Sequence, residues 1–299
     1  MPQSKLATVI KTTRPPFLIL APICVVYGAA LSTSTAETFN YFHFFLAITA
    51  GIIAHVSVNT FNEYFDFKSG LDMKTSRTPF SGGSNGLPQH PECVSAVLYV
   101  AIASLGITFL IGLYFVSIYG FALVPLGLLG CLIIFTYTKW LNKHPFLCWL
   151  SPGLGFGPLM VMGTYFVLTG SYDLNATVAS FIPFLLANNL LLLNQLPDEE
   201  ADKEVGRKHI VIEYGKTKAV TIYTVTTVLC ILVVLLCVWL DVLPIGSLLA
   251  MLPLFLGLFV AQKIKQLNYE IAECIPFLGA NVAITLLVPS IIAIAILLT

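Results

Sequence analysis

Charged side chains are scarce in this 299-residue sequence, in which Asp, Glu, Lys and Arg together make up only 10%. A soluble domain normally carries about 25% charged residues, so this composition excludes most soluble classes. The formal net charge is zero, which gives no support to nucleic-acid binding. The mean hydropathy of +0.89 instead places the chain in the membrane class.

Closely spaced cysteine pairs are missing from the sequence as well. The seven cysteines form no Cys-x-x-Cys pair, and most lie in apolar runs, where cysteine acts as a small hydrophobic residue. We therefore expect neither a disulfide framework nor a zinc site. The first long apolar run follows Arg14-Pro15-Pro16 without a convincing small-residue cleavage site, so we expect a retained span instead of a signal peptide.

Long apolar runs fill the rest of the sequence and predict an all-α integral membrane fold. A hydrocarbon core of about 30 Å needs about 20 apolar residues of helix. Nine transmembrane helices are predicted on this basis, at 16–34, 41–62, 92–113, 118–138, 147–170, 177–196, 217–240, 242–262 and 276–298. We expect them to form one transmembrane domain over residues 1–299.

The distribution of charge supports nine spans and gives them a direction. With nine spans, all fifteen Lys and Arg residues fall on the side of the N-terminus, and the other side carries only Glu37, Asp173 and Asp241. The positive-inside rule then predicts a cytoplasmic N-terminus and a C-terminus on the far side of the membrane.

The two long polar connections, 63–91 and 197–216, fall on the predicted cytoplasmic side. Long loops on a rigid scaffold often carry the functional residues. The far-side connections are expected to be short, at 35–40, 114–117, 171–176 and 240–242.

The first long connection begins with an acidic cluster. Asn62 and Asp66 are four residues apart and share one helical face, and Asn59 lies on that face one turn earlier. Gly70 is expected to end the helix and to let Asp72 fold back toward the same point.

The second long connection repeats this pattern. Asn194, Asp198 and Asp202 follow one another at intervals of four residues, and Pro197 is expected to kink the helix without changing the Asp spacing. Two such carboxylate pairs facing each other would form an oxygen-only, negative pocket that suits Mg²⁺ with phosphate oxygens. Four spans separate Asn62 from Asn194, so we expect two parallel four-helix repeats plus a ninth helix, with the site between the repeats.

Basic residues flank both clusters and are suited to hold the free oxygens of a diphosphate. They are Arg14, Arg77, Lys139, Arg207 and Lys208. The run Ser81–Ser84 could present backbone N–H groups to phosphate or be only a flexible loop. Tyr137 ends the fourth span beside Lys139, and His55 lies one turn before Asn59, where it could face the pocket.

The paired motifs resemble those of the UbiA superfamily of intramembrane prenyltransferases. The resemblance rests on Asn62-Glu63-Tyr64-Phe65-Asp66 through Asp72, together with Asp198-x₃-Asp202. The position of Asp72 and the following Arg77-Thr78-Pro79-Phe80-Ser81-Gly82-Gly83 are similar to the branch that attaches a polyprenyl chain to 1,4-dihydroxy-2-naphthoate in menaquinone biosynthesis. Glu63 stands where the family commonly has Asp.

The resemblance implies two bound Mg²⁺ ions. Asn62, Asp66 and Asp72 would hold one, and Asp198 and Asp202 the other. The ions would bridge to the diphosphate of an allylic prenyl donor, and an electron-rich aromatic ring would attack the allylic cation left by loss of diphosphate.

The basic side chains would share the charge of the diphosphate in this mechanism. Arg77 and Lys139 would take part in catalysis with Asp66, Asp198 and Tyr137. Arg14, Arg77, Lys139, Arg207 and Lys208 would contact the diphosphate, and the isoprenoid tail would lie between helices in a groove open to lipid.

Other functions stay open at this point. The same chemistry could serve another acceptor, such as 4-hydroxybenzoate, a lipid precursor or a tetrapyrrole. A secondary transporter also has repeats, but its binding site lies near the bilayer midplane, whereas these spans have almost no ionisable residues away from their ends. A prenyl diphosphate, an aromatic acceptor and the lipid bilayer are the expected partners; nothing in the sequence points to nucleic acid or to a protein partner.

Overall fold

The computed structural model describes residues 5–36 and 38–299, and all regular secondary structure within them is helical. The elements are α1 (Lys5–Thr12), η1 (Pro15–Phe17), α2 (Leu20–Ser32), α3 (Tyr41–Ser69), η2 (Leu71–Met73), α4 (Gly86–Gln89), η3 (Pro91–Cys93), α5 (Val94–Tyr119), η4 (Gly120–Leu123), α6 (Val124–Thr136), η5 (Leu141–Lys143), α7 (Pro145–Leu154), η6 (Gly155–Val161), α8 (Met162–Thr169), α9 (Leu174–Asn194), α10 (Glu199–Glu204), α11 (Ile210–Tyr214), α12 (Lys216–Trp239), η7 (Ile245–Ala250), α13 (Met251–Gln266) and α14 (Ile271–Leu297).

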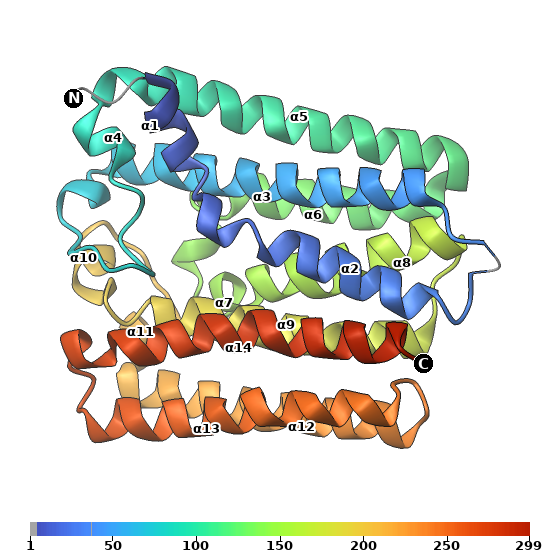
Figure 1. Ribbon diagram of the computed structural model, residues 1–299. Helices are drawn as coiled ribbons and strands as arrows, with labels where there is room; N and C mark the ends of the chain where they lie inside the picture. Colours follow the sequence, from blue (N-terminus) through green and yellow to red (C-terminus); the bar gives the residue numbers. More distant parts are fainter. Residues whose placement is uncertain (1–4, 37) are drawn as a thin grey trace.

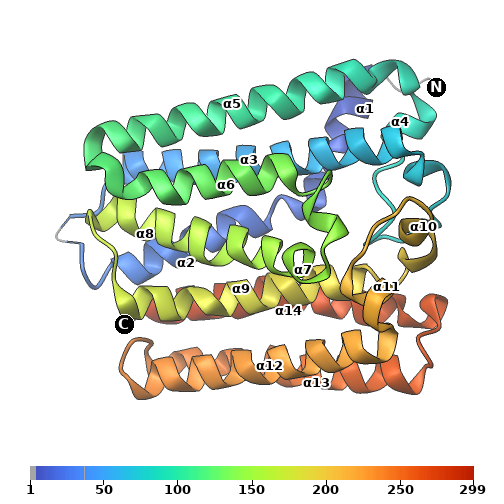
Figure 2. The same ribbon diagram turned by 180° about the vertical axis from the view of Figure 1, so that it is seen from behind.

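The long helices run side by side as a bundle (Figures 1 and 2). In the described residues, seven helices are long and apolar enough to cross a membrane, or up to eight if the bent pair Lys5–Phe17 and Leu20–Ser32 makes one span. The chain is therefore an integral membrane protein built from helices. The short elements α1, α4 and α10 gather at one end of the bundle, and α14 ends at the other (Figure 1).

One of the seven candidate spans, Pro91–Thr136, is 46 residues long and contains a reversal of the chain. Figures 1 and 2 show α5 and α6 running back along each other. The predicted connection at 114–117 is wrong, because α5 continues through it to Tyr119. The turn comes at Gly120, whose φ of 76° is a conformation that glycine adopts without strain.

The helices that carry the acidic clusters end differently. α3 runs on to Ser69 and stops at Gly70, whose left-handed backbone donates its N–H to the carbonyls of Asp66 and Phe67, as predicted. α9 stops at Asn194, and α10 begins only at Glu199. The second cluster is thus not on one kinked helix, because Pro197, which lacks an N–H, lies in a turn between two helices.

The span from α7 to α8 is irregular in the middle. Residues Gly155–Val161 form a π-helix that contains Pro158. The chain packs closely on α9 here, since the Gly153 N–H donates to Asn188 Oδ1 at 2.8 Å. A Cβ atom at Gly153 would lie 2.3 Å from that same oxygen, so the contact requires glycine.

The largest apolar core lies among α2, α9, α12, α13 and α14, and includes Tyr27, Leu192, Val234 and Leu254. The helices α3, α5, α6, α7 and α9 instead enclose a cavity. This arrangement leaves one part of the bundle closely packed and another open to a ligand.

Candidate active site

A cavity of about 610 Å³ extends from the acidic clusters into the bundle. Its walls are mainly apolar, from residues such as Ala54, Leu123, Ile133 and Leu159. Its charged side chains lie at one end, near the loops, together with several amide side chains and one histidine: Arg14, Asn62, Asp66, Asp72, Asn194, Gln195, Asp198, Asp202, Arg207 and His209. The cavity can therefore hold a long apolar molecule with a charged head.

The first acidic cluster is built by α3 and the turn after it. Asn62 and Asp66 face the cavity from one side of the helix, and Gly70 turns the chain so that Asp72 lines it too. Both carboxylates are buried, and Asn62 Oδ1 accepts a hydrogen bond from Thr138 at 3.1 Å.

The second acidic cluster lies at the junction of α9 and α10. Asn194 is the last residue of α9, Asp198 precedes α10, and Asp202 lies within α10. All three line the same cavity as the first cluster. Asp202 Oδ2 lies 3.1 Å from Nε2 of the buried His209.

Arg207 joins the two clusters directly. Its Nη1 donates to Asp202 Oδ1 at 2.8 Å, and its Nη2 forms an ion pair with Asp66. Residues 141 positions apart in the chain thus share one guanidinium. The predicted convergence of two acidic clusters on one point is present in the geometry.

Glu63 holds the rim of the site together. Its buried side chain accepts from Arg14 Nε at 2.7 Å and from the backbone N–H of Ser84 at 2.8 Å. The Ser84 hydroxyl also donates to Glu63, at 2.5 Å. Both Glu63 oxygens therefore hold two segments against α3: the segment before α2, and Ser81–Ser84, the glycine loop.

The glycine loop also reaches the second cluster. The Gly82 N–H donates to Asp198 Oδ2 at 3.3 Å, and a Cβ atom at Gly83 would lie only 2.9 Å from Asp72 Oδ1. This loop therefore lies across both clusters.

Burial changes the acidity of two carboxyl groups at the rim. Desolvation, followed by the charges of Asp66 and Glu63, raises the pKa of Asp72 to about 7. Desolvation, followed by the charge of Asp202, likewise raises the pKa of Asp198 to about 7. Both carboxyl groups therefore hold a proton more tightly in this site than they do in water.

Several buried oxygens at the site lack a hydrogen-bond donor within the part of the chain that the structure describes. They are Asp72 Oδ2, Asp198 Oδ1, Asn142 Oδ1, Asn194 Oδ1 and Gln195 Oε1. A buried acceptor without a partner is costly, and carboxylate and amide oxygens are the ligands that a hard cation prefers. In residues 5–36 and 38–299, no three His, Cys, Asp or Glu side chains already converge on a metal-sized point. The donor set fits a divalent cation, provided that Arg207 gives up its carboxylates.

Not every predicted basic residue reaches the cavity. Arg14, Arg207 and Tyr137 line it, whereas Arg77, Lys139 and Lys208 are exposed and lie outside its lining. Arg77 instead donates to the carbonyl oxygen of Asp72 at 2.6 Å.

The cavity also contains polar residues that sequence reasoning missed. Gln195, Asn142, Ser151 and His209 line it without belonging to either motif. The position of Gln195 next to Asn194 was a usable signal, whereas Asn142 and Ser151 belong to elements without a recognisable pattern.

The chain belongs to the UbiA prenyltransferase family, whose sequence model matches residues 20–296. It is a prenyltransferase, and the alternative of a secondary transporter is wrong. It is 30% identical over 213 residues to the 1,4-dihydroxy-2-naphthoate octaprenyltransferase of Bacillus subtilis. This match covers 70% of this chain and 67% of that protein. The enzyme of the same name from Haemophilus influenzae is 29% identical, over 70% of this chain and 69% of its own.

Solved structures share the fold at much lower sequence identity. A UbiA homologue from Aeropyrum pernix K1 matches with a TM-score of 0.70 and 18% identity, over 95% of this chain and 98% of that one. A UbiA homologue from Archaeoglobus fulgidus, solved with DMAPP and Mg²⁺, matches with a TM-score of 0.65 and 12% identity, over 93% and 99%.

Proposed function

We propose that this prenyltransferase moves a polyprenyl group from a prenyl diphosphate to 1,4-dihydroxy-2-naphthoate and requires Mg²⁺. One observation carries the proposal: two buried acidic clusters meet at the polar end of a long apolar cavity. The naphthoate enzymes among the relatives, and the Mg²⁺ in the homologous structure with DMAPP, support the acceptor and the metal.

The acidic residues divide between two metal positions in this proposal. Asn62, Asp66 and Asp72 hold one ion, and Asp198 and Asp202 hold the second. Bound ions neutralise the charge that develops on the departing diphosphate. The unpartnered oxygens of Asp72 and Asp198 support these roles.

The cationic side chains complete the diphosphate site. Arg14 and Arg207 line the cavity and contact the free diphosphate oxygens. Arg77, Lys139 and Lys208 lie outside the cavity lining, and in this proposal they approach the diphosphate when the donor is bound. Tyr137 faces the reacting centre from the end of α6.

The apolar part of the cavity holds the isoprenoid chain and keeps water from the allylic cation. The walls from α3, α5, α6 and the α7–α8 span contain few polar groups along this length. The other acceptors, 4-hydroxybenzoate among them, share this reaction and differ only in the ring that enters.

The membrane topology belongs to the same proposal. We infer nine crossings in a single domain, because the Pro91–Thr136 stretch reverses direction and α1 and the end of α14 lie at opposite ends of the bundle. α3 and α9 then occupy matching positions in two four-helix repeats. The acidic clusters and the N-terminus face the cytoplasm, as the distribution of Lys and Arg predicts.

Purified protein in lipid, incubated with a labelled prenyl diphosphate and a panel of aromatic acceptors, tests this function. We expect transfer to 1,4-dihydroxy-2-naphthoate that stops on addition of EDTA. Preferential transfer to 4-hydroxybenzoate would refute the acceptor assignment, and transfer that persists in EDTA would refute the metal requirement.

A further inference from the structure

His55 lies in the cavity wall, and its side chain has no hydrogen-bond partner among the described residues. Its side chain is on α3, two turns deeper in the bundle than Asn62, and is 8% exposed. Neither ring nitrogen has a hydrogen-bond partner in the described part of the chain, and Nδ1 is fully shielded from solvent. An unpaired buried imidazole of this kind calls for an explanation.

The other buried histidine of α3 shows how a structural histidine is held in this protein. His43 Nδ1 lies 2.9 Å from the Tyr119 hydroxyl and 3.3 Å from the Val167 carbonyl oxygen. Its role in packing is therefore complete without a ligand. His55 has only a ring contact, edge to face with Phe156 at 5.0 Å.

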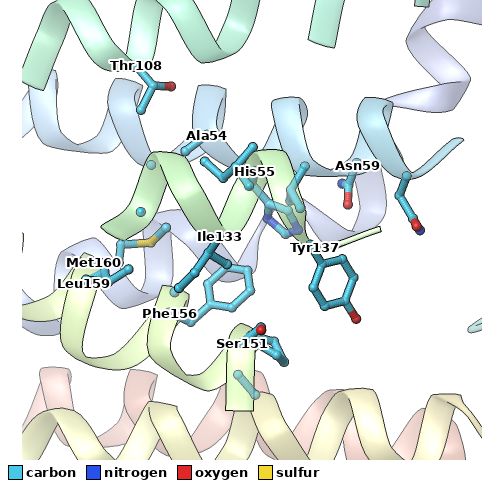
Figure 3. Close-up of a pocket in the computed structure, with 18 of the residues that line it drawn as sticks. Ala54, His55, Asn59, Thr108, Ile133, Tyr137, Ser151, Phe156, Leu159 and Met160 are labelled. Carbon is cyan, nitrogen blue, oxygen red and sulfur yellow. The ribbon is translucent and has the colours of Figure 1, made fainter. Parts of the chain in front are cut away.

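The surroundings of His55 fit an aromatic ring that carries a hydroxyl group. Figure 3 shows His55 and Asn59 on α3 facing Tyr137, Phe156 and Ser151 across one part of the cavity. The Phe156 ring provides an apolar contact for a planar molecule. The imidazole supplies a hydrogen-bond acceptor beside it.

The distance along α3 between His55 and Asn62 places His55 near the aromatic acceptor and away from the diphosphate. Seven residues of helix separate His55 from Asn62, which is about 10 Å along the axis. A donor whose diphosphate is held at Asn62 and Asp66 places its reactive carbon within this interval. The ring that attacks this carbon then lies beside His55.

We propose that His55 is the catalytic base that accepts the proton of the acceptor's ring hydroxyl. This inference rests on the proposed function. The aromatic ring forms a carbon–carbon bond to C1 of the donor with one of its π electron pairs, and the C1–O bond breaks with its pair left on the diphosphate. The hydroxyl proton moves to the His55 imidazole. The hydroxyl carbon of the acceptor ring is then an uncharged ketone.

Aromaticity returns in the next step. Where the attacked carbon carries the carboxylate, its bond to that group breaks, CO₂ leaves, and the electron pair left on the ring restores aromaticity. Where it carries hydrogen, that proton passes to the released diphosphate and its bonding pair restores the ring. In both cases the ring oxygen takes back the proton from His55. The imidazole ends neutral and ready for the next turnover. General-base assistance of this kind contributes about 10²- to 10⁴-fold to a rate.

Chemical rescue tests the proposal. Wild-type protein, His55→Ala and His55→Gln are assayed in lipid with Mg²⁺, geranyl diphosphate and 1,4-dihydroxy-2-naphthoate, with and without added imidazole. We expect His55→Ala to lower kcat at least about 100-fold, to change the donor KM little, and to recover activity with imidazole. His55→Gln keeps a hydrogen-bonding group but no base, so its acceptor KM stays close to wild type while kcat is low.

The exposed His144 provides the matched control, since His144→Ala removes an imidazole outside the cavity lining. It should keep wild-type activity and show no response to imidazole. If His55→Ala does not fold, His55→Gln provides the test, because its kcat should fall while its acceptor KM stays close to that of the wild type. A kcat in either variant within about threefold of wild type, or a loss that imidazole does not restore in folded His55→Ala, overturns the role of His55. Wild-type protein that prenylates no aromatic acceptor refutes the proposed function, and this inference with it.

Discussion

Arg207 connects the two acidic clusters of the site. Its guanidinium neutralises Asp66 on α3 and Asp202 on α10 at the same time. These carboxylates are also proposed metal ligands, so a cation and Arg207 compete for the same oxygens. If these carboxylates bind a metal as proposed, Arg207 must first release them.

Substitution of Arg207 should separate metal binding from turnover. We expect Arg207→Ala to bind Mn²⁺ more tightly in the absence of donor, by about 10-fold, the value of one charge-assisted contact. The same variant should lose about 10- to 100-fold in kcat/KM for the donor, because the diphosphate loses a cation. Mn²⁺ titration by electron paramagnetic resonance and steady-state kinetics measure the two effects, and an unchanged Mn²⁺ affinity would contradict the competition.

The carboxyl groups of Asp72 and Asp198 should make the metal-free protein sensitive to pH. Their pKa values are about 7 in the folded chain against an ordinary value of 3.8, so the folded state keeps protons that the unfolded state has released. Stability from these groups is therefore full below about pH 4 and lost as the pH rises toward 7. Thermal unfolding in EDTA should show this fall, and Asp72→Asn should reduce it; a melting temperature that is independent of pH in both proteins would contradict it.

Residue spacing alone could identify the carboxylates but not their partners. The intervals from Asn62 to Asp66 and from Asp198 to Asp202 place each pair on one helical turn, and this is a local property. The pairing of Arg207 with Asp66 spans 141 positions and depends on how the helices pack. For the same reason, the sequence suggested five flanking cations without distinguishing among them, whereas the cavity is lined by two of the five, Arg14 and Arg207.

Among the elements of the site, the glycine loop leaves the least room for a larger side chain. Gly83 has a φ of 72°, and a side chain there would collide with Asp72. Gly82 and Ser84 on either side of it donate to Asp198 and Glu63. Two N–H groups of the loop are thus directed to carboxylates. We infer that the loop sets the distance between the two clusters.

Gly83→Ala should therefore impair catalysis out of proportion to its effect on folding. Gly170 provides the matched control, because its backbone is left-handed with a φ of 81° and the nearest atom to an added Cβ, on Tyr119, lies at an ordinary contact distance of 3.9 Å. Both substitutions should cost about 1 kcal/mol of stability for the left-handed backbone. Only Gly83→Ala should lower kcat, by about 10-fold or more; equal kcat values for the two variants would show that the loop does not position Asp72.

The long helices were predictable because length and apolar composition suffice to define a span. The breaks within them were harder to predict. The turn before α6 lies at Gly120 instead of 114–117, since an apolar run does not mark where a helix reverses. The π-helix of Gly155–Val161 begins two residues after the close contact of Gly153 with α9, and no period in the sequence marks it.

For the whole molecule, the proposed orientation can be tested by labelling. Lys68→Cys and Asp241→Cys place exposed thiols at opposite ends of the bundle, whereas six of the seven native cysteines are buried. A maleimide that cannot cross membranes should label Asp241→Cys in intact cells and Lys68→Cys only after permeabilisation. The reverse pattern would place the acidic clusters on the far side.

In the proposed function, both acidic clusters bind the metal ions and the diphosphate of a single donor. The most direct measurement is an experimental structure of the protein with Mn²⁺ and a non-reactive prenyl thiodiphosphate, in which anomalous scattering locates the metal. We expect two Mn²⁺ ions, one held by Asn62, Asp66 and Asp72 and the other by Asp198 and Asp202. Arg207 should have moved from the carboxylates to the diphosphate, and the prenyl chain should lie in the apolar cavity. A donor bound elsewhere, or Mn²⁺ absent while Arg207 still joins Asp66 to Asp202, would contradict it.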